Sequence, residues 1–246
     1  MNSEAFDLFL CILIGYAFGC ILPADLIGRF KKKSPFENGS GNPGMTNTIK
    51  TMGKTAGALV LGGDILKTIL AVILCKMLFP AWSDIAPLYA GIGVMLGHCY
   101  PFWHHFQGGK GVAVCCSAYI LYAPIPGIIA LACGGICLLL KLGVKIAAAV
   151  IPLVFCVFLL FRFSWISFVP AFLMGIWLAW MNLRPNRLKD GVPNPEAKSL
   201  RKALAKPKDQ SGGTQAALPG SESPIPASAS LSDQEKIRQP ASANRS

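Results

Sequence analysis

Residues 56–79 read AGALVLGGDILKTILAVILCKMLF, an apolar run that contains only three charged side chains. A helix that crosses a bilayer needs about 20 predominantly apolar residues, so this stretch is long enough to span a membrane. Asp64 and Lys67 lie inside it, three residues apart and therefore on one face of the predicted helix. Charges at such a depth are costly unless they are paired. They indicate either a functional interior or a structural ion pair between helices, and both interpretations stay open at this point.

Six further apolar stretches accompany this one, which gives seven in all. They cover residues 6–28, 85–100, 112–123, 127–140, 146–161 and 165–181. The run from Val112 to Leu140 is too long for one upright helix, and it contains Pro124 and Pro126, which interrupt helices. We therefore predict a hairpin of two short helices there, with one kinked span and six crossings as the alternative. The predicted fold is all-α, a polytopic membrane protein with about seven transmembrane helices.

The composition also favours a membrane protein. Of the 246 residues, 53% are apolar and only 14% are charged, with a net charge of +11. A nucleic-acid-binding protein would carry its basic residues on a soluble domain, for which the apolar runs leave no room. Attraction to anionic lipid headgroups and anionic substrates explains the charge more simply. Because the basic residues gather in alternate loops and in the tail, we expect the N-terminus outside and the C-terminus in the cytoplasm.

The domain organisation follows from a change of composition beyond Asn182. Residues 1–182 form the predicted transmembrane domain, and residues 183–208 a basic cytoplasmic segment. Residues 209–246 are dominated by Ser, Ala, Pro and Gln and show no hydrophobic periodicity. Such a segment buries too little apolar surface to offset its chain entropy, so we predict that it is disordered.

Two familiar kinds of ligand site are not expected. The nine cysteines all lie in or beside apolar stretches at irregular spacing, which is typical of small buried side chains and not of a metal centre. The sequence MGKT at residues 52–55 resembles the end of a nucleotide-binding P-loop, but that motif requires glycine at the position of Thr48.

Three polar segments are predicted to face the same side of the membrane. They are ENGSGNPGMTN at 37–47, GHCYPFWHHFQGGKGVA at 97–113 and NLRPNRLKDG at 182–191. Glycines allow backbone N–H groups to surround an anion, and the Gly-Gly-Lys-Gly run directly precedes a predicted helix whose positive end favours phosphate. Lys110 adds a full positive charge. The two glycine-rich segments together predict an anion-binding site.

Three histidines lie in the second polar segment, and one of them is a candidate general base. His98 comes at its start, while His104 and His105 flank aromatic residues. For the latter pair, the position beside Trp103 indicates polar residues at the membrane interface. No carboxylate cluster accompanies the histidines.

The motifs GSGNPGMTN (39–47), GHCYP (97–101) and FQGGKGVA (106–113) resemble those of the bacterial acyl-phosphate:glycerol-3-phosphate acyltransferases, the PlsY family. GGDILK at 62–67 fits a further polar position of that pattern. The resemblance implies seven transmembrane helices in the bacterial cytoplasmic membrane. It also implies transfer of a fatty acyl group from acyl phosphate to the sn-1 hydroxyl of glycerol 3-phosphate, giving 1-acylglycerol 3-phosphate. Membrane lipid is an implied partner, and no cofactor, metal or nucleic acid is expected.

The resemblance also implies roles for particular residues. Ser40, Lys110 and His98 are the implied catalytic residues: Ser40 orients substrate, Lys110 holds phosphate and His98 shapes the loop. The implied substrate- and phosphate-binding residues are Gly39, Gly41, Asn42, Gly44, Thr46, Asn47, Lys50, Asp64, Lys67, Gly108, Gly109, Gly111 and Arg184.

Several positions depart from the family pattern. Lys50 stands where the family has arginine, and Gln107 stands where it has the first lysine of Lys-Gly-Gly-Lys-Gly. The family's C-terminal His-Arg-Glu-Asn is not recognisable, and Asn182, Arg184, Asn186 or Arg187 is the expected substitute. A membrane transporter for an organic phosphate or anion, using Asp64 and Lys67, is the alternative function.

Overall fold

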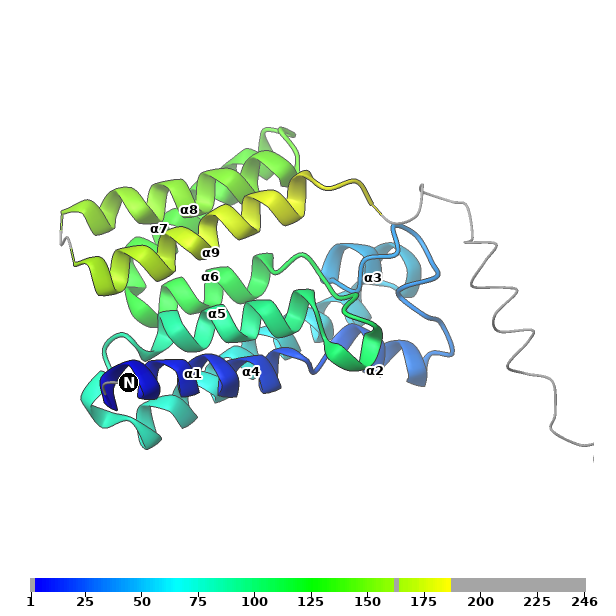
Figure 1. Ribbon diagram of the computed structural model, residues 1–246. Coiled ribbons are helices and arrows are strands. Elements are labelled where there is room, and N and C mark those ends of the chain that lie inside the picture. Colours follow the sequence, from blue (N-terminus) through cyan, green and yellow to red (C-terminus); the bar gives the residue numbers. More distant parts are fainter. Residues whose placement is uncertain (1–2, 162–163, 187–246) are drawn as a thin grey trace, which may run out of the picture. The chain divides into compact units, whose positions relative to one another are not determined.

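The computed structural model describes residues 3–161 and 164–186, and within these ranges all regular structure is helical (Figure 1). Seven helices in this part of the chain contain eleven or more residues: α1 (Ser3–Gly19), α4 (Lys54–Leu78), α5 (Ala86–Cys99), α6 (Val112–Tyr122), α7 (Pro124–Leu139), α8 (Val144–Leu160) and α9 (Trp165–Leu183). The shorter elements are α2 (Pro23–Phe30), α3 (Met45–Met52) and the 3-10 turns η1 (Pro80–Trp82) and η2 (Phe102–His104). The predicted all-α fold is confirmed.

Among the described residues, three segments are long and apolar enough to cross a membrane: Glu4–Phe30, Lys54–Leu78 and Trp165–Leu183. Helices α6, α7 and α8 are apolar but shorter. The predicted hairpin is confirmed, because α6 and α7 are separate helices divided at Ala123, and Gly127 of α7 packs against the backbone of Ile120. The alternative of a single kinked span is therefore wrong.

The uninterrupted apolar run at residues 6–28 predicted one continuous helix, but the structure shows two. It divides into α1 and α2 at residues 20–22, and α2 begins with Pro23. Proline has no backbone N–H and is tolerated in the first turn of a helix, so it suits a new start. Lys67 stabilises this break, since its ammonium group donates to the carbonyl oxygen of Gly19 over 3.2 Å and to that of Ile21 over 2.9 Å.

Helices α1 and α5 approach each other closely along two glycine pairs. These glycines are Gly15, Gly19, Gly93 and Gly97. A Cβ atom at Gly97 would collide with the carbonyl oxygen of Tyr16, and one at Gly93 with that of Ile12. Small residues four apart allow helix backbones to pack directly in a membrane protein. This contact fixes the end of α5, which carries His98.

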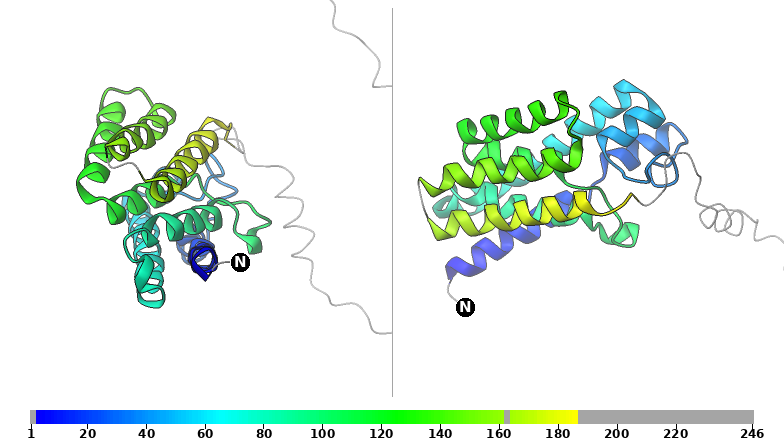
Figure 2. Two further views of the ribbon diagram at one scale, coloured as in Figure 1. Left: turned by 60° about the vertical axis from the view of Figure 1, so that its left-hand side comes forward. Right: turned by 90° about the horizontal axis from the view of Figure 1, so that it is seen from above.

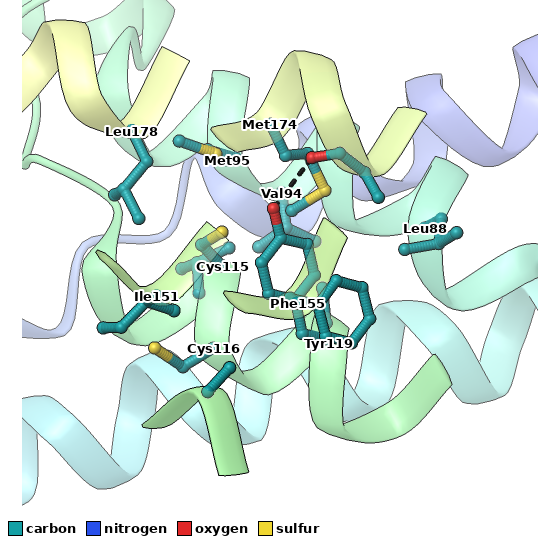
Figure 3. Packing of buried hydrophobic residues seen from close by; sticks show 14 of the residues in the cluster. Leu88, Val94, Met95, Cys115, Cys116, Tyr119, Ile151, Phe155, Met174 and Leu178 are labelled. Atoms are coloured by element: carbon teal, nitrogen blue, oxygen red, sulfur yellow. Dashed lines mark hydrogen bonds between the residues drawn. The ribbon is translucent and has the colours of Figure 1, made fainter. Parts of the chain in front are cut away.

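The apolar core lies between α5, α6, α8 and α9 (Figure 3). The rings of Tyr119 and Phe155 stack with centroids 3.9 Å apart, and the Tyr119 hydroxyl donates to the Ala171 carbonyl oxygen over 2.8 Å. Seven of the nine cysteines are buried among apolar neighbours, as expected, and Cys133 and Cys137 are half-buried.

The polar segments gather at one end of the helices. Successive long helices run in opposite directions, so α1, α5 and α9 end where α4, α6 and α8 begin, and α2 and α3 lie beyond that point (Figures 1 and 2). We call this the polar end. The tail from residue 187 on, including Arg187 and the predicted disordered segment 209–246, lies outside the described residues.

Candidate functional site

The first loop, residues 34–44, is organised by a single side chain. Asn47 of α3 is only 2% exposed. Its Oδ1 accepts the Ser40 N–H over 2.9 Å, and its Nδ2 donates to the carbonyl oxygens of Pro35 (2.9 Å) and Asn38 (3.0 Å). Both amide hydrogens of Asn47 therefore bind the chain itself, and the residue fixes the backbone around Ser40.

The glycines of the first loop permit this arrangement. Gly39 and Gly41 have φ angles of 62° and 69°, a region that favours glycine. A Cβ atom at Gly39 would also collide with Oδ1 of Asn47. Gly44 caps α3, and its carbonyl oxygen accepts both the N–H and the hydroxyl of Thr48.

The remaining predicted residues of this region lie closer to solvent. Ser40 and Asn42 are half-buried, whereas Thr46 in the first turn of α3 and Lys50 in its last turn are exposed. A phosphate group outside the first loop can therefore approach these side chains.

The second loop, residues 100–111, is held by backbone hydrogen bonds. The N–H groups of Gly108 and Gly109 donate to the carbonyl oxygens of Cys99 and His98, each over 2.9 Å. A Cβ atom at Gly108 would collide with the His98 carbonyl, and one at Gly109 with the His98 ring. These two glycines thus serve close packing on α5, and their N–H groups already have acceptors. Gly111, with a φ of 80°, begins α6.

His98 belongs to a buried polar cluster with Asp64 and Lys67. The three residues are 3%, 3% and 4% exposed. Nζ of Lys67 lies 2.8 Å from Oδ1 of Asp64 and 2.9 Å from Nδ1 of His98, which is itself 3.2 Å from the same carboxylate oxygen. Of the two interpretations left open by the sequence, these contacts favour an ion pair, which lies within α4 and includes His98 of α5. Because the cluster is enclosed by protein groups, its described contacts are those of a structural support beneath the second loop.

Lys110 faces the third polar segment. Its Nζ donates to Oδ1 of Asn186 over 3.0 Å, and Arg184 donates to the hydroxyl of Tyr100 over 3.3 Å while covering the Trp180 ring at 3.8 Å. Of the expected substitutes for the family's C-terminal motif, Asn186 contacts Lys110. Asn182 is buried and donates to the Leu178 carbonyl of its own helix.

Partial burial lowers the pKa of Lys110, and the positive charge of Lys145 lowers it further. The sequence did not indicate Lys145 as a site residue, because it belongs to none of the three polar segments and lies 35 positions after Lys110. Only the packing of α8 beside α6 brings this charge near the second loop.

His104 connects the two loops. Its Nε2 lies 3.2 Å from Oδ2 of Asp25, which also accepts from Arg29 over 2.9 Å, and its ring packs on Phe36 with centroids 4.9 Å apart. The sequence predicted only an interfacial residue. Asp25 and His104 are 79 positions apart, so no local pattern indicates the pair.

Comparison with known proteins agrees with this arrangement of motifs. The family model described as glycerol-3-phosphate acyltransferase matches residues 9–189. Glycerol-3-phosphate acyltransferase 1 of Lactobacillus johnsonii is 37% identical over 160 residues, covering 65% of this chain and 77% of the relative. Glycerol-3-phosphate acyltransferase of Bacillus subtilis is 40% identical over 117 residues, covering 47% and 59%. For Lactobacillus acidophilus glycerol-3-phosphate acyltransferase 1, the match is 47% over 111 residues and covers 53% of the relative, so this chain spans little more than half of some curated relatives.

The fold is also that of a solved structure. The crystal structure of PlsY (YgiH), an integral membrane glycerol 3-phosphate acyltransferase in its glycerol 3-phosphate form, aligns with a TM-score of 0.63 and 23% identity. The alignment covers 83% of this chain and 94% of that chain. At this identity the likeness concerns the fold, while the family model covers most of the sequence. The chain belongs to the glycerol-3-phosphate acyltransferase family.

Proposed function

We propose that this protein transfers a fatty acyl group from acyl phosphate to the sn-1 hydroxyl of glycerol 3-phosphate, forming 1-acylglycerol 3-phosphate and inorganic phosphate. The observation that carries the proposal is the contact of Lys110 with Asn186. It joins the glycine-rich second loop to the third polar segment at the polar end, where the loop that contains Ser40 also lies. Family membership supports the same reaction.

The reaction needs little covalent chemistry from the protein. The sn-1 oxygen forms a bond to the acyl carbon, the bond from that carbon to the phosphate oxygen breaks, and the hydroxyl proton leaves with phosphate. Because acyl phosphate is already reactive, positioning and neutralisation of negative charge account for catalysis. We assign charge neutralisation to Lys110, with Lys50 and Arg184 as further cations, and orientation of the hydroxyl to Ser40.

The location that we propose is the bacterial cytoplasmic membrane, with the polar end in the cytoplasm. The basic side chains support this orientation, since they are concentrated at the polar end and Lys76 is the lone lysine near the other end of the described helices. The orientation also gives the site access to a soluble phosphate ester and to a lipid-tailed donor from the bilayer.

The test is an assay with purified protein, acyl phosphate and glycerol 3-phosphate. We expect release of phosphate together with 1-acyl product, no acyl transfer from acyl-CoA, and loss of turnover in Lys110→Ala. Phosphate release that does not exceed the Lys110→Ala control would refute the proposal. The transporter alternative predicts uptake of an organic phosphate into proteoliposomes without acyl transfer, but the enclosed contacts of Asp64 and Lys67 give it no support.

A further inference from the structure

A basic surface cavity lies beside the first loop and has no part in the proposed reaction. It has a volume of about 230 Å³ and is lined by Lys31, Lys33, Thr51 and Met52. Nζ of Lys33 lies 3.4 Å from the Thr51 carbonyl oxygen, so one ammonium group stands at the wall of the cavity. Two lysines at one hollow favour an anionic group such as a phosphate.

The helix that leads into this cavity presents apolar side chains outward. In α2, Ala24 and Gly28 are buried, whereas Leu26 is 48% exposed and Phe30 is 89% exposed. Leu26 and Phe30 are four residues apart and form one ridge, directly before Lys31. An apolar ridge bordered by lysines is typical of a helix at the boundary between acyl chains and headgroups.

The cavity wall is connected to Ser40 by hydrogen bonds. The Thr51 hydroxyl donates to the Asn47 carbonyl oxygen over 2.9 Å, and the Asn47 side chain accepts the Ser40 N–H. A second connection runs through Gly28, which packs against the Lys33 carbonyl and Pro35. A group bound between the lysines and Thr51 would therefore restrain the structure that holds the first loop.

We propose that this cavity binds the phosphate of an anionic phospholipid, with an acyl chain along Leu26 and Phe30, and that the bound lipid stimulates the enzyme by stabilising the first loop. Charge complementarity selects an anionic headgroup, and the adjoining apolar ridge selects a lipid over free phosphate. The binding site is independent of the proposed function, whereas the stimulation rests on it.

The matched control is Lys32, which lies between the two lining lysines, is exposed and does not line the cavity. Lys31→Gln/Lys33→Gln removes the cavity lysines, and Lys32→Gln removes a neighbouring charge. Near an anionic membrane each lysine contributes roughly a fivefold change in binding through its charge alone. If lipid binding depended only on the total positive charge, Lys32→Gln would therefore reduce lipid retention as much as either single variant, Lys31→Gln or Lys33→Gln.

Binding is measured first, by native mass spectrometry of phosphatidylglycerol retained on the detergent-purified protein. We expect wild type and Lys32→Gln to retain the lipid equally, Lys31→Gln/Lys33→Gln to retain at least about tenfold less, and inorganic phosphate not to displace it. Equal lipid retention by all three proteins would overturn the proposal, and so would displacement of the lipid by phosphate. An equal loss of lipid in Lys31→Gln, Lys32→Gln and Lys33→Gln would also overturn it.

Stimulation is measured in vesicles of phosphatidylcholine alone and in vesicles of phosphatidylcholine with one fifth phosphatidylglycerol. We expect the initial rate of wild type and Lys32→Gln to rise severalfold with phosphatidylglycerol, and that of Lys31→Gln/Lys33→Gln not to respond. A response that is the same in all three would refute the regulatory role. If no protein turned over under any condition, the proposed reaction would fail while the binding result stood.

Discussion

The two glycine-rich loops at the polar end have similar compositions but are held in different ways. In the first loop a side chain, Asn47, binds the backbone, and Gly39 and Gly41 are needed for their positive φ angles. In the second loop the backbone binds the end of α5, and Gly108 and Gly109 are needed because the His98 residue leaves no space for a Cβ atom. Glycine thus supplies conformation in one loop and close packing in the other.

The largest effect is expected for Gly109→Ala. Its methyl group would collide with the buried His98 ring, so the second loop and Lys110 must move. A displacement of about 1 Å can cost about 100-fold in rate, and we expect kcat/KM to fall by about that factor. Gly135→Ala is the matched control, since a Cβ there meets nothing within 4 Å. Steady-state kinetics that match for both variants would show that close packing is not what the second loop requires.

Lys67→Met tests the support beneath the second loop. It leaves Asp64 buried beside His98 without its ammonium partner, and breaking a buried ion pair typically costs about 3–5 kcal/mol. We expect a clear fall in Tm in detergent, and a smaller fall in the double variant Asp64→Asn/Lys67→Met, which removes both charges. Lys76→Met, on the same helix near its exposed end, should melt as wild type does. A double variant less stable than Lys67→Met would argue against the pairing.

Asn47→Ala tests the first loop. It removes three hydrogen bonds, each worth about 0.5–1.5 kcal/mol, and frees the backbone around Ser40. We expect kcat/KM to fall by roughly tenfold or more, since that factor corresponds to about 1.4 kcal/mol. The exposed Asn38, whose side chain donates only to the Ser34 carbonyl, provides Asn38→Ala as the control. If both variants behaved alike, the special role of Asn47 would be lost.

The charge on the second loop should appear in the pH dependence of substrate binding. Lys110 is protonated and positively charged at a pH well below its pKa, and it loses this charge as the pH rises through the pKa. Because burial and Lys145 lower that pKa, the KM for glycerol 3-phosphate should begin to rise at a lower pH than an ordinary lysine would give. Lys110→Arg stays charged over this range and should show no such rise in KM. A KM that rises equally in both proteins would assign the titration to another group.

The smallest effect is expected where the two loops touch each other. His104→Ala removes the contact with Asp25 and the packing on Phe36, but Asp25 keeps Arg29 as a partner. Ion pairs near the surface contribute about 0–1 kcal/mol, so kcat/KM should change by less than about fivefold. A greater loss in the same assay would mean that the loops act as one unit.

Much of the architecture could be predicted from local sequence. The run at 56–79, the prolines after Tyr122 and the alternation of basic loops indicated the helices, the hairpin and a common end for the three polar segments. The break at residues 20–22 was missed because its stabilising group, the Lys67 ammonium, comes from another helix. The glycine N–H groups expected to surround phosphate proved, at Gly108 and Gly109, to be bonded to α5.

By itself, the sequence determined the membrane character, the helical class and the motifs of the family, because apolar run length and residue spacing act over short distances. Tertiary structure alone decided that Asn186 meets Lys110, that Asp64 and Lys67 enclose His98, and that Asp25 meets His104. These contacts bring together segments that lie far apart in the sequence. Their geometry depends on how closely α1, α4, α5 and α9 pack, which no local pattern of residues encodes.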